Sequence, residues 1–198
     1  MRVRDADKEK LVVANAIELI VRDGFQGFSM NKLAKACNIS VATLYIYYKD
    51  KDDLIKKIGT EVTLEFFSFT IENFSPDMNF EEGLWVQWQN RAAFTFKHPK
   101  KVAFFEVIKQ SPHAEDILNS TTKFSDFRII MKKFINNALQ NKEIIEMQFE
   151  VFWSIAYGPL YTLLNFHNEG KSLGGRPFKL TQEMMREAFQ ASIRGLKP

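Results

Sequence analysis

The hydrophobic and polar positions of residues 28–54 follow the pattern of two short helices joined by a tight turn. Leu33, Ala34 and Cys37 form a short apolar face, which the run 38–40 interrupts. Leu44 and Tyr48 then resume an apolar face at an i, i+4 spacing, which puts both side chains on one side of a second helix. This arrangement is typical of a helix-turn-helix.

Three polar side chains mark the ends of these two helices. Ser29 and Ser40 each precede an expected helix, where a serine oxygen can accept a hydrogen bond from an unpaired backbone N–H. Asn38 lies in the turn, where a positive φ is expected and asparagine tolerates it better than most residues. The second helix then exposes the side chains that would reach another molecule, namely Val41, Ala42, Thr43, Tyr45, Ile46 and Tyr47.

The rest of the chain has helical periodicity over almost all of its length, and no stretch alternates as a half-buried strand does. Helices are expected over residues 51–73, 79–97, 100–110, 114–140, 147–167 and 181–196, with 114–140 divided into a short and a long helix. Pro99 suits the first turn of the helix that it begins, and Gly158-Pro159 should kink the helix 147–167. The sequence therefore predicts an all-α fold.

Charge is distributed unevenly between the two parts of the chain. The formal net charge is +3, and residues 1–58 hold 11 Lys and Arg against 8 Asp and Glu, so the whole excess lies in the N-terminal segment. Scattered lysines usually form only a solvated surface. Here Lys49 and Lys51 stand beside Tyr47 at the start of the next helix, where amines and a phenol can meet the phosphates of nucleic acid.

Residues that could support catalysis or hold a metal are sparse. The three histidines are His98, His113 and His167, and none has a second ligand at metal-binding helical spacing. No nucleophile elbow or phosphate-binding loop is present, so neither an enzyme nor a bound cofactor or metal is expected.

Cysteine usage and hydropathy favour an intracellular protein. The single cysteine, Cys37, excludes an intrachain disulfide and is expected to pack in the interior. No apolar run reaches the length that spans a membrane, and the N-terminus lacks the apolar core of a signal peptide. A cytoplasmic location is therefore expected.

Three short motifs follow one another in the N-terminal segment: Gly24-Phe25 after an apolar helix, Leu44-Tyr45-Ile46-Tyr47-Tyr48, and Lys51-Asp52-Asp53-Leu54. Together they resemble the DNA-binding domain of the TetR family of bacterial transcriptional regulators, over residues 8–54. Three positions depart from the family's pattern: Asn15 replaces a small apolar residue, Asn38 a glycine, and Ile46 a histidine or arginine.

The resemblance implies a DNA-binding domain over residues 1–54 and a helical effector-binding and dimerisation domain over 55–198. The residues expected to contact a DNA operator are Ser29, Ser40, Val41, Ala42, Thr43, Tyr45, Ile46, Tyr47, Lys49 and Lys51. Because three of the helix residues, Val41, Ala42 and Ile46, carry no hydrogen-bond donor, contacts with thymine methyl groups are expected to supply much of the sequence preference.

The larger domain is rich in aromatic residues, and the resemblance implies that part of its interior receives a small effector. The candidates lie on apolar faces of helices that should converge: Trp85, Trp88, Phe105, Phe127, Met131, Trp153 and Tyr157, with Arg91 and Tyr161 as polar groups. An aromatic lining favours an apolar or aromatic effector. The alternative is that these side chains form an ordinary core.

The two C-terminal helical segments carry more apolar surface than a one-sided helix needs. Residues 147–167 include Phe149, Phe152, Trp153, Ala156, Leu160, Leu163 and Leu164, and residues 181–196 include Met184, Met185, Ala188, Phe189 and Ile193. Such a surplus is typical of an interface, and the resemblance implies a homodimer through these helices. The alternative is that they close the core of the monomer.

These observations favour a ligand-responsive transcriptional repressor that binds a pseudo-palindromic operator as a homodimer. The alternative is a cytosolic protein that binds a small ligand and has no specific operator recognition.

Overall fold

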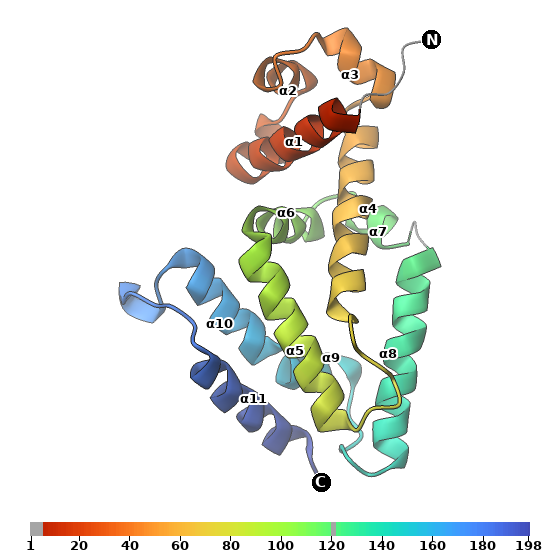
Figure 1. The fold of residues 1–198 in the computed structure, drawn as a ribbon, viewed down its shortest axis with the longest axis vertical. Helices are drawn as coiled ribbons and strands as arrows, with labels where there is room; N and C mark the ends of the chain where they lie inside the picture. The colour runs from red at the N-terminus through yellow and green to blue at the C-terminus, as the bar shows by residue number, and fades with distance from the viewer. Residues whose placement is uncertain (1–5, 120–121) are drawn as a thin grey trace. The chain divides into compact units, whose positions relative to one another are not determined.

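A computed structural model of the chain describes residues 6–119 and 122–198 (Figure 1). Over these residues it contains eleven α-helices, one short 3-10 helix and no β-strand, which confirms the all-α class. No helix in the described part of the chain is long and apolar enough to cross a membrane. The helices divide into two compact units, Met1–Glu65 with His98–Phe124 (unit 1) and Phe66–Lys97 with Ser125–Pro198 (unit 2).

Unit 1 contains the N-terminal helices and two helices from later in the chain. These are α1 (Ala6–Gly27), α2 (Met30–Ala36), α3 (Val41–Tyr47), most of α4 (Lys51–Thr70), α6 (Pro99–Lys109) and α7 (Ala114–Asn119). Helix α1 packs against α2 and α6, and α2 packs against α3. Gly24 interrupts α1 with φ 67° and ψ 178°, a conformation that glycine adopts without steric cost.

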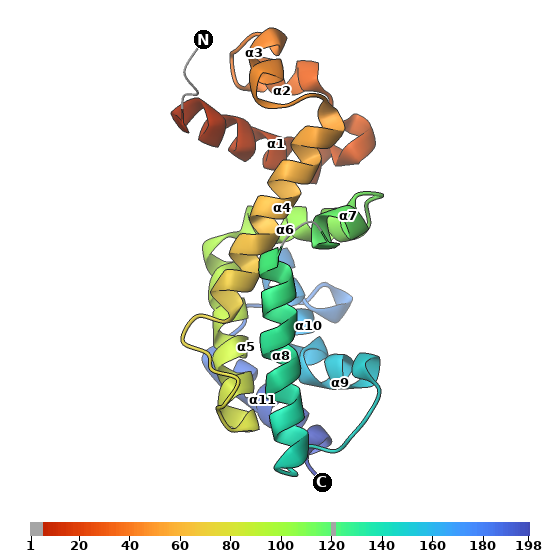
Figure 2. The ribbon, with the colours of Figure 1, turned by 90° about the vertical axis from the view of Figure 1, so that its right-hand side faces the viewer.

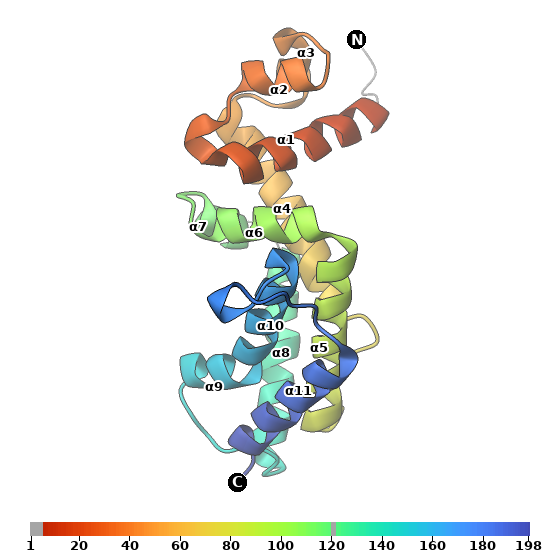
Figure 3. The same cartoon turned by 90° about the vertical axis from the view of Figure 1, so that its left-hand side faces the viewer.

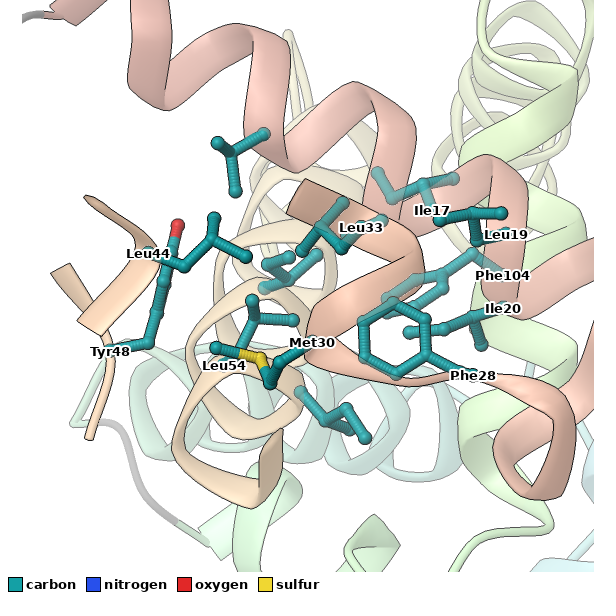
Figure 4. Packing of buried hydrophobic residues seen from close by; sticks show 14 of the residues in the cluster. Ile17, Leu19, Ile20, Phe28, Met30, Leu33, Leu44, Tyr48, Leu54 and Phe104 are labelled. Atoms are coloured by element: carbon teal, nitrogen blue, oxygen red, sulfur yellow. The ribbon is translucent and has the colours of Figure 1, made fainter. Parts of the chain in front are cut away.

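The core of unit 1 explains why α6 and α7 belong to it. Leu33, Leu44 and Leu54, from α2, α3 and α4, are fully buried together (Figure 4). Phe104 of α6 and Ile117 of α7 are buried in the same cluster. The packing unit therefore differs from the expected domain of residues 1–54, because two helices distant in sequence complete its core.

Unit 2 contains five helices, namely α5 (Phe80–Lys97), most of α8 (Thr122–Gln140), α9 (Phe149–Ala156), α10 (Gly158–Glu169) and α11 (Gln182–Leu196). Helix α10 packs against α5, α9 and α11 (Figure 3). Helix α8 contacts α5 through the stacked rings of Phe134 and Phe80, whose centroids are 5.5 Å apart. Both helices are labelled in Figure 2. A loop with the 3-10 helix Leu173–Gly175 connects α10 to α11.

The helix boundaries follow local signals in the sequence. Pro99 occupies the first turn of α6, and Thr181 caps α11 by accepting a hydrogen bond from the Met184 backbone N–H. The expected kink at Gly158-Pro159 is a complete break, so residues 147–167 form two helices, α9 and α10. Proline has no N–H to donate to the preceding turn, which is why it begins a helix more readily than it continues one.

Candidate functional site

The helix-turn-helix of unit 1 is fixed by hydrogen bonds that the sequence predicted. The Ser29 Oγ accepts from the Lys32 backbone N–H at 3.3 Å, and the Ser40 Oγ accepts from the Thr43 N–H at 3.2 Å. Asn38 has φ 52°, as expected for the turn. These contacts confirm the N-caps of α2 and α3 and fix the residue at which each helix begins.

Helix α3 presents one apolar and aromatic surface to solvent. Tyr45 is 53% exposed and Ile46 is 46% exposed, and Ala42 is also exposed. Val41 and Thr43 are half-exposed, and the Thr43 hydroxyl pairs with that of Ser40. The face that α3 offers to another molecule is therefore centred on Ala42, Tyr45 and Ile46.

The expected exposure of Tyr47 is wrong. Tyr47 is only 8% exposed and belongs to the core of unit 1, as does Tyr48. Tyr47 follows Leu44 by three residues, so it lies on the buried side of α3, and Tyr48, the extended residue that ends the helix, is buried as well. Tyr47 therefore helps to seat α3 on the rest of unit 1.

The two lysines after α3 differ in their surroundings. The Lys51 Nζ donates to the Phe25 carbonyl at 2.6 Å and lies 5.9 Å from the centre of the Phe28 ring, so this side chain ties the start of α4 to the end of α1. The Lys49 side chain is exposed. Of the two, Lys49 has the amine that can move toward a phosphate without breaking a contact within unit 1.

The segment that joins α3 to α4 is held by Asp53. The Asp53 carboxylate accepts from the Lys57 Nζ at 2.9 Å and from the Lys49 backbone N–H at 2.9 Å. The hydrogen bond from Lys57, followed by that from Lys49, holds the pKa of Asp53 below its usual range. The Lys57 Nζ also donates to the Tyr47 carbonyl at 3.1 Å, so the C-terminal end of α3 is fixed from α4.

Unit 2 brings three of the expected effector-site residues, Trp153, Tyr157 and Tyr161, together around a fourth, Arg91. The Arg91 side chain is buried, with 1% exposed, and its Nη1 donates to the Tyr161 hydroxyl. Its guanidinium carbon lies 4.5 Å from the centre of the Tyr157 ring and 5.6 Å from that of Trp153. Burial raises the pKa of Tyr157 to about 12, so its phenol stays protonated at neutral pH.

The other two tryptophan candidates pack elsewhere in unit 2. The Trp88 side chain is fully buried, its indole Nε1 donates to the Ala156 carbonyl at 2.8 Å, and its ring meets Phe189. Trp85 is half-buried between the Phe189 ring and the Arg186 guanidinium. Both contacts join α5 to α11, which is the arrangement expected of an ordinary core.

The remaining candidates also lie outside the group around Arg91. Phe127 packs against Phe67 with ring centres 4.5 Å apart, and Met131 is half-buried at the edge of the core of unit 2. Phe105 belongs to α6 in unit 1.

Sequence reasoning missed two neighbours of Arg91. Gln87 is fully buried, and its Oε1 accepts from the Tyr157 hydroxyl at 2.7 Å. The Phe66 ring centre lies 5.5 Å from the Arg91 guanidinium carbon. The spacing of Gln87 and Arg91 was a usable signal, because polar residues four apart share one face of a helix whose neighbouring positions are apolar.

The apolar surplus of the C-terminal helices is largely consumed within unit 2. The buried members of the expected interface are Phe152, Ala156, Leu160, Leu164, Met185, Phe189 and Ile193. These side chains form core, so their role as an intersubunit surface is corrected. Phe149 and Met184 remain exposed, and Ala188 is half-exposed.

No group of three or more His, Cys, Asp or Glu side chains that could hold a metal ion occurs in residues 6–119 and 122–198.

Comparison with known proteins agrees with the helix-turn-helix. Residues 12–58 match the family described as "Bacterial regulatory proteins, tetR family". An uncharacterised HTH-type transcriptional regulator of Haemophilus influenzae is 22% identical over 197 residues, which cover 100% of each chain. IcaR of Staphylococcus epidermidis, the HTH-type negative regulator of the biofilm operon icaADBC, is 25% identical over 112 residues, 57% of each chain.

Solved structures share the fold along the whole chain. A TetR family transcription regulator from Marinobacter aquaeolei superposes with a TM-score of 0.79 at 24% identity, covering 99% of this chain and 98% of that one. A TetR-family regulator from Haemophilus influenzae superposes with a TM-score of 0.76 at 22% identity, covering 98% and 100%. Proteins of this family are DNA-binding regulators and not enzymes. Residues 12–58, which hold the capped helix-turn-helix, therefore carry a DNA-binding domain of the tetR family of bacterial regulatory proteins, and the chain as a whole shares the fold of solved regulators of that family.

Proposed function

We propose that this regulator is a repressor that binds a pseudo-palindromic operator as a homodimer and leaves it when a small, largely apolar effector binds unit 2. The observation that carries the proposal is the exposed surface of helix α3, formed by Ala42, Tyr45 and Ile46. This helix belongs to a helix-turn-helix in which a serine caps the start of each helix. IcaR, a relative of similar length, is named as a negative regulator. The cytoplasm is the compartment in which such a protein would meet its operator.

In this proposal α3 enters the major groove and reads the operator mainly by apolar contact. Ala42 and Ile46 offer methyl groups, which suit the thymine C5-methyl, and Tyr45 adds an exposed aromatic ring with a hydroxyl. We also propose that residues 1–54 form the DNA-binding domain, because all of these DNA-contacting residues precede residue 54. Operator half-sites are expected to be rich in thymine.

The effector acts by favouring one spacing over another between the two DNA-binding heads, which are residues 1–54 of each subunit of the proposed dimer. It can shift that equilibrium only by the difference in its affinity for the two states, which is typically worth about 1–3 kcal/mol. By the same linkage, a saturating operator must weaken effector binding by an equal factor.

Operator binding is tested by its dependence on salt. Lys49→Ala is expected to weaken binding to all DNA sequences alike and to reduce the slope of log affinity against log salt by about one per head, because one phosphate contact is lost. The measurement is fluorescence anisotropy with genomic fragments that wild type selects, over a series of salt concentrations. Lys179→Ala, which removes an exposed lysine of unit 2, is the matched control and should leave the slope unchanged. Weakened discrimination at one base pair with an unchanged slope would contradict the phosphate role of Lys49.

The proposed homodimer is tested by substitutions at residues that are exposed in the monomer, because these do not disturb its core. On α11, the positions 184, 188, 191 and 195 form one stripe of Met184, two alanines and a glycine, which would let a partner helix approach closely. Ala191 is exposed, so Ala191→Glu should not disturb the monomer.

If α11 contributes to the interface, Ala191→Glu places an unpaired charge there and should give a folded monomer in sedimentation velocity. Gln182→Glu adds the same charge at an exposed position away from the stripe and should remain dimeric. An Ala191→Glu protein that stays dimeric would place the interface on other helices.

A further inference from the structure

Three buried hydrogen-bond donors on one face of α5 have no partner among the residues that the structure describes. They are the Nε and Nη2 atoms of Arg91 and the Nε2 atom of Gln87, and both side chains are at least 99% buried. The two residues are four positions apart, so they lie one above the other on the helix. Both also contact Tyr157, whose hydroxyl donates to Gln87 and whose ring lies beside the Arg91 guanidinium. Buried polar groups are almost always paired, so three such donors in one place indicate a missing acceptor.

The two free nitrogens of Arg91 define the shape of that acceptor. Nε and Nη2 form one edge of the planar guanidinium, and their N–H groups point in parallel from it. A carboxylate fits this edge with two parallel hydrogen bonds. The other edge is engaged, since Nη1 donates to the Tyr161 hydroxyl.

Arg91 also forms no ion pair with an acidic side chain in the part of the chain that the structure describes. Four aromatic rings, those of Phe66, Trp153, Tyr157 and Tyr161, lie within 5.8 Å of its guanidinium carbon. Rings attract a cation through their faces but carry no net charge. A buried cation is costly unless an anion pairs with it, and a single guanidinium neutralises one negative charge. The favoured partner is therefore a monoanion.

The surrounding rings determine what the rest of the partner must be. Tyr157 is fully buried, whereas Trp153 and Tyr161, whose ring centres lie 5.6 and 5.8 Å from the guanidinium carbon, are half-exposed. An occupant that reaches Arg91 must displace or lie against these two rings, so most of its surface has to be apolar.

We propose that the effector is a hydrophobic monocarboxylic acid, whose carboxylate pairs with Nε and Nη2 of Arg91 and receives a further hydrogen bond from Gln87. The inference rests on the proposed effector-binding function of unit 2 and specifies its ligand class. The acid's alkyl or aryl body then lies among Trp153, Tyr161 and Phe66.

The test uses the full-length protein and a series of probes of stated chemistry. The acids are straight-chain alkanoates from hexanoate to hexadecanoate and phenylalkanoates, each matched with its primary amide and with the alkyl phosphate of the same length. Binding is followed by tryptophan fluorescence, to which Trp153 should respond, and by isothermal titration calorimetry. At least one acid should bind, and at least about tenfold more tightly than its amide, as expected for a hydrogen-bonded charge pair. The alkyl phosphate, a dianion at neutral pH, should bind more weakly than the acid.

Arg91→Met and Arg91→Lys separate recognition from packing. Arg91→Met keeps the length and apolar stem of the side chain and should remove the preference for acid over amide. Arg91→Lys keeps the charge but not the paired donors, so it should retain only part of the preference. Without any probe, Arg91→Met should melt at a temperature equal to or above that of wild type, because a buried unpaired charge has been removed. Ile129→Met, at an exposed position of α8, is the matched control and should bind acids as wild type does.

Several outcomes would overturn the inference. They are equal binding of acid and amide to wild type, an acid preference that survives in Arg91→Met, a lower melting temperature of unliganded Arg91→Met, and no binding by any acid at millimolar concentration.

Failure of the proposed regulatory function can be distinguished from failure of this ligand class, because the binding and melting measurements contain no DNA. Acids that bind through Arg91 and leave operator binding unchanged would refute effector control alone. Release from DNA by a neutral compound, with Arg91→Met responding as wild type, would refute the ligand class alone.

Discussion

Truncation of Trp88 to alanine is expected to lower the free energy of unfolding of unit 2 by about 3–5 kcal/mol, which is the usual cost of removing a buried tryptophan. The indole is fully buried against Phe189, and its Nε1 donates to the Ala156 carbonyl at the end of α9. Its loss leaves a cavity between α5 and α11 and an unpaired backbone carbonyl. This expectation replaces a role for Trp88 in contacting the effector.

Urea unfolding followed by tryptophan fluorescence measures this effect in unit 2 specifically. All three tryptophans, Trp85, Trp88 and Trp153, lie in unit 2, so Trp88→Ala retains two reporters there. Trp85→Ala is the control, because Trp85 is half-buried and donates no hydrogen bond to α9, and it should cost clearly less. Equal destabilisation by the two substitutions would show that burial of Trp88 does not dominate the packing of α5.

Removal of the two large exposed side chains of α3, by Tyr45→Ala with Ile46→Ala, is expected to reduce operator affinity by about 1–3 kcal/mol per half-site. In the proposed dimer the loss occurs twice, so the complex should weaken by about 2–6 kcal/mol, or roughly 30-fold to more than 10,000-fold. Since both side chains are exposed, the stability of unit 1 should change by no more than about 0.5 kcal/mol.

The measurement is a titration of a selected operator fragment and of an unrelated fragment at fixed salt. Binding to the unrelated fragment should change little, because phosphate contacts supply most non-specific affinity. Ile129→Ala, which truncates an exposed isoleucine of unit 2, should bind the operator as wild type does. A double variant with unchanged operator affinity would exclude the exposed face of α3 as the reading surface.

The helix-turn-helix was predictable because its determinants are local. Ser29 and Ser40 cap helices that begin at the following residue, and Asn38 takes the positive φ of the turn. Each of these features involves residues within three or four positions of one another. Pro99 and Thr181 located the starts of α6 and α11 for the same reason.

The surroundings of the proposed effector-site residues were only partly predictable. The aromatic candidates share the same residue types and the same helical spacing. The sequence therefore could not separate the aromatic residues that only fill the core from those that surround Arg91. Trp88 meets α11, whereas Trp153 and Tyr161 meet Arg91. The Arg91 side chain could equally have pointed to solvent, because a long charged side chain on a helix usually does.

The sequence by itself determined the all-α class, the helix-turn-helix with its caps and the positions of most helix ends, since hydrogen bonds within one turn set these features. The tertiary structure alone decided three others. It placed Phe104 and Ile117 in the core of unit 1, buried Tyr47 on the inner side of α3, and enclosed Arg91 among aromatic rings with two nitrogens unpaired. Each depends on contacts between residues far apart in the chain, and periodicity shows which face of a helix is apolar but not which partner covers it.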